Sequence, residues 1–168
     1  MGHTHPKNNN PQEPILKIRQ IEIRTFIHAT ESREKIFHFF DNLTGSEDNK
    51  LEIQADQCHG FYGQSITPLV LRITTQKLIK QFMSYLGEHL SEQSKRQLLR
   101  ELESRLDSKF KLFLRLDKQE AVLGRLQLVS HSDVFQVIIA FFNKNPKAHL
   151  NSQHIINYLH KFNIFLGE

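Results

Sequence analysis

The segment from Lys111 to Asp117 alternates between two chemical types of residue. Leucine fills every second position, and the positions before and between the leucines hold Lys111, Phe113 and Arg115. Because successive side chains of a strand point to opposite faces of a sheet, this pattern predicts a buried leucine face and an opposite face that carries one ring and two cations. Rings stack on nucleobases and cations attract phosphates, so the opposite face is suited to RNA.

A segment near the N-terminus, residues 21–27, repeats the arrangement. Isoleucine and threonine share one of its faces, and the other face carries Glu22, Arg24 and Phe26, with His28 next in the same alternation. The residues that the two strands could offer to RNA are Arg24, Phe26, His28, Lys111, Phe113 and Arg115. The same pattern also fits a face that is covered by the terminal helix or by another subunit, with its two phenylalanines simply buried. The strand patterns alone favour neither reading.

Three polar residues, Asp117, Lys118 and Gln119, follow the second of these strands. Asp117 can accept backbone N–H groups across a turn, an arrangement that needs no ligand and that the residue types favour. The functional alternative makes Lys118 a phosphate contact and Gln119 a reader of polar groups. On that alternative, Lys118 completes the set of residues predicted to bind RNA.

The sequence lacks the short motifs of common catalytic sites: the nucleophile elbow, the glycine-rich phosphate loop and His-Glu-x-x-His. The single cysteine, Cys58, has no partner for a disulfide or a Cys-x-x-Cys metal site, and it indicates a reducing, cytoplasmic setting. Asp107 and Asp117 could support metal-dependent hydrolysis, together with a histidine, if they met in space. That hydrolase is a lesser hypothesis, and we expect a protein that is not an enzyme and that uses no cofactor and no metal.

Hydrophobic spacing and capping residues predict the elements that must position these side chains. In chain order they are a strand over 21–27, a helix from a Thr30 cap to Leu43, a short strand near 51–55, a strand over 66–74, a helix ending near Gly87, a helix capped by Ser91, strands over 111–116, 123–129 and 134–142, and a helix over 151–162 capped by Asn151. The order β-α-β-β-α-α-β-β-β-α predicts an α+β fold, a two-layer mixed or antiparallel sheet with helices on one face.

The chain of 168 residues can bury one real core, because 39% of its residues are hydrophobic. We expect residues 1–14 to form a flexible arm, residues 15–145 a single α+β domain, and residues 146–168 a C-terminal helical extension packed on the domain or on a partner. No apolar run reaches the ~20 residues that cross a membrane. Residues 72–125 carry twelve Lys or Arg against seven Asp or Glu, which suits a polyanionic partner.

Three segments give the chain a likeness to a known family. They are Phe26-Ile-His-Ala-Thr-Glu31, Gly60-Phe-Tyr-Gly-Gln-Ser-Ile66 and Leu114-Arg-Leu-Asp-Lys-Gln-Glu-Ala-Val-Leu-Gly124. In their order and spacing they resemble an archaeal family described as a predicted RNA-binding subunit associated with the exosome, over residues 18–142. Gln64 and Ser65 stand where that family usually has asparagine and proline, and Arg125 stands where it often has an acid.

The resemblance implies a domain similar in fold to the ribosomal protein that binds 5S RNA. It also implies a role near RNA processing or degradation, with RNA and exosome subunits as partners. The leading hypothesis is a non-enzymatic RNA-binding or exosome-accessory protein that uses the basic and aromatic sheet face. The alternative is a structural or assembly module whose sheet face is a homodimer or hetero-partner interface.

Overall fold

The computed structural model describes residues 12–45, 58–59 and 65–165. In chain order its elements are β1 (Leu16–His28), α1 (Arg33–Thr44), β2 (Cys58–His59), β3 (Ser65–Ile73), α2 (Gln76–His89), α3 (Glu92–Arg105), β4 (Lys111–Asp117), α4 (Lys118–Val122), β5 (Val134–Asn143) and α5 (Ser152–His160). The fold is α+β, as predicted. The short strand predicted near residues 51–55 and most of the loop that precedes β3 lie outside the described residues.

The strands form one sheet in the order β2-β3-β1-β5-β4, and every pair of neighbours is antiparallel. β1 is the central strand, and its 13 residues pair with β3 on one side and β5 on the other. β4 pairs with β5 over its full length. The two strands that carry the predicted binding residues, β1 and β4, are therefore separated by one strand only.

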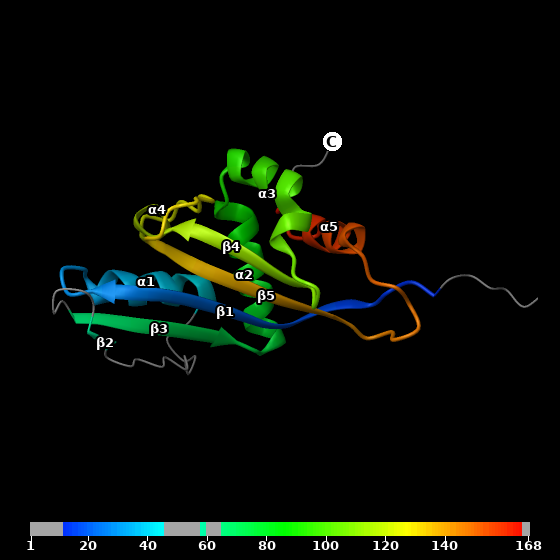
Figure 1. The fold of residues 1–168 in the computed structure, drawn as a ribbon, viewed down its shortest axis with the longest axis horizontal. Coiled ribbons are helices and arrows are strands. Elements are labelled where there is room, and N and C mark those ends of the chain that lie inside the picture. The colour runs from blue at the N-terminus through cyan, green and yellow to red at the C-terminus, as the bar shows by residue number, and fades with distance from the viewer. Residues whose placement is uncertain (1–11, 46–57, 60–64, 166–168) are drawn as a thin grey trace, which may run out of the picture.

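One face of the sheet is buried, and the helices cover it; in Figure 1 the strands pass in front of α1 and α2. The alternate residues of β1 that were predicted to face the core are buried, as are the three leucines of β4. The helices contribute buried apolar side chains to the same core, among them Ile36, Phe40, Phe82, Leu98, Leu102, Ile155 and Leu159. No helix of the described residues is both long and apolar enough to cross a membrane.

Aromatic contacts show on which side of the sheet the helices pack. The ring of Phe135 on β5 stacks on Phe39 of α1, with ring centroids 4.6 Å apart. Phe141, on the same face of β5, meets Tyr158 of α5 edge-on at 5.8 Å. The terminal helix therefore lies on the buried face, and the reading in which it covers the outer face is wrong.

Side-chain caps decide where the helices begin. The side chains of Ser91 and Asn151 cap α3 and α5, as predicted. The prediction that Thr30 caps α1 is wrong, because the side chain of Ser32 accepts the N–H of Lys35 instead. A backbone turn after β1 occupies the residues up to Glu31 and delays the start of the helix.

Residues 123–129 do not form the predicted strand. The chain coils into the short helix α4 directly after β4, and Gly124 then turns it with a φ of 82°. The residues beyond are extended but make only isolated bridges, from Leu126 to Leu90 and from Leu128 to Leu116. Leu126 and Leu128 are buried, whereas Leu123 is 65% exposed, so the alternation of the later residues reflects burial rather than a ladder of hydrogen bonds.

The helix α2 ends at His89, close to the predicted end near Gly87. Gly87 is buried where the backbone of Phe162 crosses the helix, and a Cβ atom added at Gly87 would lie 1.7 Å from the carbonyl oxygen of Phe162. The glycine thus serves a close approach of two backbones rather than a helix end.

Replacing Gly87 with alanine should lower the free energy of unfolding by about 2 kcal/mol or more, because the added methyl group must displace the Phe162 backbone. Urea unfolding followed by circular dichroism measures the change. Ser84→Ala, at an exposed position of the same helix, is the matched control and should stay within about 0.5 kcal/mol of the parent protein. Equal midpoints for the two variants would contradict the close approach.

Candidate functional site

The second face of the sheet carries the outward side chains of four strands, and we call it the open face. Its residues are Gln20, Glu22, Arg24 and Phe26 of β1, Pro68, Val70 and Arg72 of β3, Lys111, Phe113 and Arg115 of β4, and Gln136, Ile138 and Ala140 of β5. Ring contacts place α1 and α5 on the other face, and of the described helices only the C-terminal end of α3 lines a hollow at the β4 edge of the open face, beside Phe113 and Arg115. The rings and cations of β1 and β4 are therefore accessible together.

Strand register brings the two predicted sets of residues into one row. Arg24 lies opposite Gln136 of β5, and Gln136 lies opposite Arg115 of β4. Neighbouring strands are roughly 5 Å apart, so the two arginines flank a single glutamine across the sheet. Phe26 is 58% exposed, a large exposure for an aromatic ring.

A hollow of about 350 Å³ opens between these side chains. Arg24, Phe26, Arg115 and Gln136 line it, and Val70 adds to its apolar surface. The guanidinium of Arg115 donates to the carbonyl oxygen of His131 at 2.6 Å, which holds that side chain in place. A planar group in the hollow would meet a ring and two guanidinium groups, whose positive charge suits a phosphate nearby.

Glu22 is a buried acid in the middle of this basic face. Its carboxylate accepts hydrogen bonds from Arg24 and from Arg72, the latter at 3.1 Å. Burial by itself would raise the pKa of Glu22, but the two arginines outweigh burial and hold that pKa below its ordinary value. The acid therefore stays charged and orients two cations along the sheet.

The other predicted residues of the two strands lie further from the hollow. His28 is exposed at the end of β1, beyond Phe26. Phe113 is half-buried and lines a separate hollow of about 280 Å³ together with Arg115. Lys111 is exposed at the start of β4, at the opposite end of the open face. The structure thus brings three of the predicted residues together, Arg24, Phe26 and Arg115.

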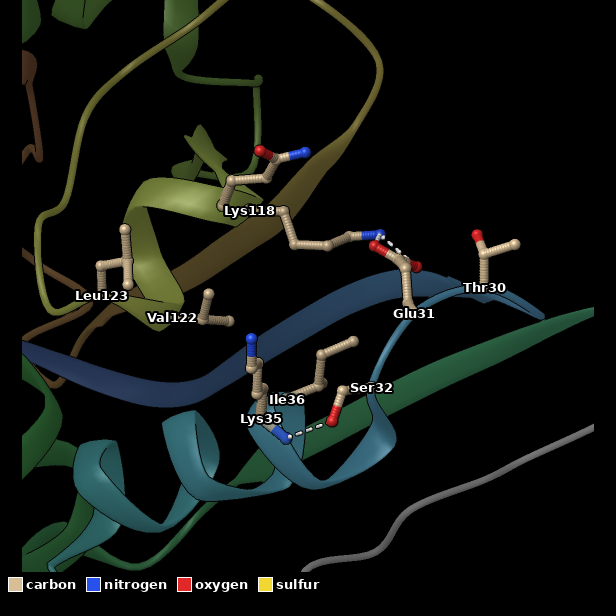
Figure 2. A pocket seen from close by; sticks show the side chains of 9 residues that line it. Thr30, Glu31, Ser32, Lys35, Ile36, Lys118, Val122 and Leu123 are labelled. Atoms are coloured by element: carbon tan, nitrogen blue, oxygen red, sulfur yellow. Dashed lines mark hydrogen bonds and ion pairs between the residues drawn. The ribbon is translucent and has the colours of Figure 1, made fainter.

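Lys118 lies away from the open face, and its side chain is only 4% exposed. Its ammonium group donates to the carbonyl oxygen of Phe26 at 2.6 Å and pairs with Glu31 at 3.0 Å and with Asp133 at 2.8 Å. Figure 2 shows the side chain reaching from α4 towards Glu31. Three partners and burial leave this lysine no free donor for a phosphate.

The pocket drawn in Figure 2 lies between α1 and α4 and has a volume of about 400 Å³. Thr30 and Lys35 border it on the α1 side, and Gln119 and Leu123 border it on the α4 side. Two of the segments that carry the family resemblance therefore meet here, 87 residues apart in sequence at the Lys118–Glu31 pair. Gln119 is exposed at this pocket rather than on the open face.

Asp117 ends β4 and caps α4, where its carboxylate accepts the N–H of Glu120 at 2.8 Å. The prediction that Asp117 binds backbone N–H groups is confirmed, although they belong to a short helix rather than a simple turn. His131 makes a second contact with this carboxylate at 2.9 Å. Burial opposes ionisation of Asp117, but these hydrogen bonds and His131 outweigh it and lower the pKa of the carboxyl.

Asp107 lies at the other end of β4 and accepts the backbone N–H groups of Lys109 and Lys111 at 2.8 and 2.9 Å. From Lys111 to Asp117 the strand spans roughly 20 Å, so the two aspartates cannot share a metal ion. Among the described residues, no three groups of His, Cys, Asp or Glu are placed to bind a metal. The geometry needed for the carboxylate-pair hypothesis is therefore absent.

Sequence reasoning missed the contributions of β3 and β5 to the open face. In β3 the buried Leu69 and Leu71 alternate with the half-buried Val70 and Arg72, which is the same signal that identified β1. In β5 the outward Gln136 interrupts an otherwise apolar run. Reading these alternations across all four strands could have found the whole face.

Comparison with known proteins gives consistent matches over most of the chain. A family model described as RNA binding matches residues 20–141. An RNA-binding protein of Pyrococcus abyssi is 31% identical over 126 residues, which cover 74% of this chain and 82% of that protein. A DUF54 protein of Methanothermobacter thermautotrophicus superposes with a TM-score of 0.66 at 26% identity, covering 86% of this chain and 97% of the other. A protein of Sulfolobus solfataricus gives 0.64 at 27% identity, with 84% and 95% covered.

Lys118→Met should lower the free energy of unfolding by about 3 kcal/mol, because it leaves Glu31 and Asp133 without their cation and the Phe26 carbonyl without its donor. This loss of stability lies at the lower end of the range for breaking a buried ion pair, because the carboxylates of Glu31 and Asp133 both keep some contact with water. Chemical denaturation measures it. Lys35→Met, an exposed lysine at the same pocket, should change stability by less than about 0.5 kcal/mol, and a similar loss in both variants would contradict the buried network.

Asp117→Asn keeps the oxygen that caps α4 but removes the charge. Because the folded-state pKa of Asp117 lies below the ordinary value of 3.8, its charge stabilises the folded protein above that value, and the benefit is lost as the pH falls through the folded-state pKa. The difference in free energy of unfolding between parent and variant should have its largest value above about pH 5 and should shrink below pH 3.8. A difference that stayed constant in urea unfolding across this range would contradict the lowered pKa.

Proposed function

The chain belongs to the RNA-binding family whose model matches residues 20–141, and on that premise we propose that it binds unpaired RNA across the open face. The observation that carries this proposal is the hollow in which Arg24, Phe26 and Arg115 meet. An exposed ring between two cations suits a base that stacks on the ring while the cations meet the flanking phosphates.

Unpaired RNA fits the face better than a duplex does. A duplex would offer phosphates and 2′-hydroxyls to the arginines, but its bases would be stacked on one another and unavailable to Phe26. A loop, a bulge or a single-stranded end leaves bases free to stack on the ring. Arg24 and Arg115 then supply contacts to phosphates, with Phe113, Lys111 and His28 as further contacts along β4 and at the end of β1.

Binding in this proposal requires no catalytic step. Asp107 and Asp117 each hold backbone N–H groups of their own turn or helix, and those hydrogen bonds account for both carboxylates. The protein would then act as an RNA-binding accessory factor. Its resemblance to a family described as exosome-associated supports a place beside RNA-degrading enzymes, with exosome subunits as its partners.

The homodimer alternative is less well supported by the composition of the face. A dimer with twofold symmetry places the same patch of both copies together. The open face carries Arg24, Arg72 and Arg115 around one buried acid, Glu22, so two copies would bring uncompensated arginines into contact. An RNA chain neutralises those arginines instead.

The proposal is tested by fluorescence anisotropy with a labelled single-stranded RNA of about ten nucleotides, a length that fits one small binding surface. Arg115→Ala should weaken binding and reduce the dependence of log affinity on log salt by about 0.7, the contribution of one phosphate contact to a single strand. Phe26→Ala should weaken binding roughly tenfold with an unchanged salt dependence, because stacking releases no counterions.

Arg100→Ala is the matched control, since it removes the same charge from an exposed position of α3 that lines none of the hollows of the open face. It should bind RNA as the parent protein does. Absence of binding by the parent protein at ~50 mM salt, where phosphate contacts count most, would overturn the proposal. Light scattering on the same sample reports whether the protein is a monomer or a dimer.

A further inference from the structure

A second basic cavity lies at the opposite end of the open face from Phe26, and we call it the end cleft. Its volume is about 600 Å³. The residues on which its chemistry depends are Arg19, Lys109, Phe110, Lys111, Phe142 and Pro146. They come from the start of β1, the turn before β4, the end of β5 and the chain that follows it.

A β-bulge in β1 points Arg19 into this region. The register of β1 against β5 shifts between Ile18 and Gln20. Ile18 and Ile21 are both fully buried, so the two residues between them face outward together instead of alternating. Arg19 lies over the ring of Phe142, with its guanidinium carbon 5.1 Å from the ring centre. The bulge in β1 thus places a cation of β1 over a ring of β5.

The opposite wall is held by the turn before β4. The carboxylate of Asp107 accepts the N–H groups of Lys109 and Lys111, which fixes both lysines relative to each other. Phe110 between them has a φ of 56°, an uncommon conformation for a bulky residue, and its carbonyl oxygen accepts the N–H of Phe141 at 3.1 Å. Hydrogen bonds to the backbone thus place two cations at the mouth of the cleft.

The charge of the cleft is of one sign. Its lining holds three cationic side chains, Arg19, Lys109 and Lys111, and no carboxylate. All three are exposed, and in the described ranges none of them pairs with an acid. Arg24 is paired with Glu22, whereas Arg19 pairs with no acid of the described residues, so its charge is available to a ligand.

We infer that the end cleft binds one nucleotide of the same RNA, with the base against the Arg19–Phe142 stack and the phosphate between Lys109 and Lys111. The inference rests on the proposed function and deepens it by naming a second contact point. Lys111 and Arg115 lie four residues apart on β4, roughly 13 Å at 3.3 Å per residue, so one extended RNA strand can reach both hollows. Part of the cleft, from Phe142 onward, lies outside the residues that the family model matches.

The three cations alone would also attract an acidic peptide, but the stacked ring favours a nucleotide. A guanidinium over an aromatic ring presents a flat surface, and nucleobases stack on such surfaces. An acidic peptide would use the cations and leave Phe142 without a role. A substitution at Phe142 therefore distinguishes the two occupants.

The test uses the full chain and the labelled RNA of about ten nucleotides in anisotropy titrations over a range of salt. Lys109→Ala should weaken binding and lower the salt dependence by about 0.7, as expected for one lost phosphate contact. Phe142→Leu should weaken binding roughly tenfold with an unchanged salt dependence, because it removes a stacking ring and no charge. Arg100→Ala serves as the charge-matched control.

Thermal unfolding checks that Phe142→Leu remains folded; Lys109 is exposed, so its substitution tests the cleft even if the phenylalanine variant is unstable. If Lys109→Ala and a folded Phe142→Leu both bind as the parent does while Arg115→Ala weakens binding, the inference is overturned and the proposed function stands. If Lys109→Ala weakens binding and Phe142→Leu does not, the cleft attracts charge only and the nucleotide assignment fails. If the parent protein does not bind, both proposals fail.

Discussion

The buried ammonium group of Lys118 is the constraint on which the arrangement of this protein depends. A cation with a side chain that is 4% exposed must be paired, and its three partners come from two separate parts of the chain. Phe26 and Glu31 lie at the end of β1, and Asp133 lies just before β5. The side chain of Lys118 therefore holds the end of β1 close to the start of β5, two strands whose outward residues belong to the open face.

The connection reaches the open face through Phe26. The carbonyl oxygen of this residue accepts a hydrogen bond from Lys118, whereas its ring lies on the opposite side of the sheet and is exposed. Glu22 plays a comparable part further along β1, because its two ion pairs hold Arg24 and Arg72 in place. Side chains that are held before a ligand arrives lose less conformational entropy on binding. The buried polar groups of this fold thus orient its exposed ones.

Sequence reasoning succeeded where a single element decides the outcome. The alternation of β1 and β4 identified their outward residues correctly, and the caps Ser91 and Asn151 marked the starts of two helices, because these signals act within a few residues. It failed where a distant segment competes. Leu126 and Leu128 alternate like the residues of a strand and are buried, but their backbone makes only isolated bridges. Gly87 resembles a helix end, but its lack of a side chain allows the backbone of Phe162 to cross the helix.

The sequence by itself determined an α+β protein and the outward and buried faces of β1 and β4, because side-chain periodicity is a local property of the backbone. Only the tertiary structure decided which of those residues meet. Lys118 and Glu31 are 87 positions apart, and Arg24 and Arg115 are joined through a third strand. Strand order and register set these distances, and they follow from the packing of the whole core rather than from any one segment.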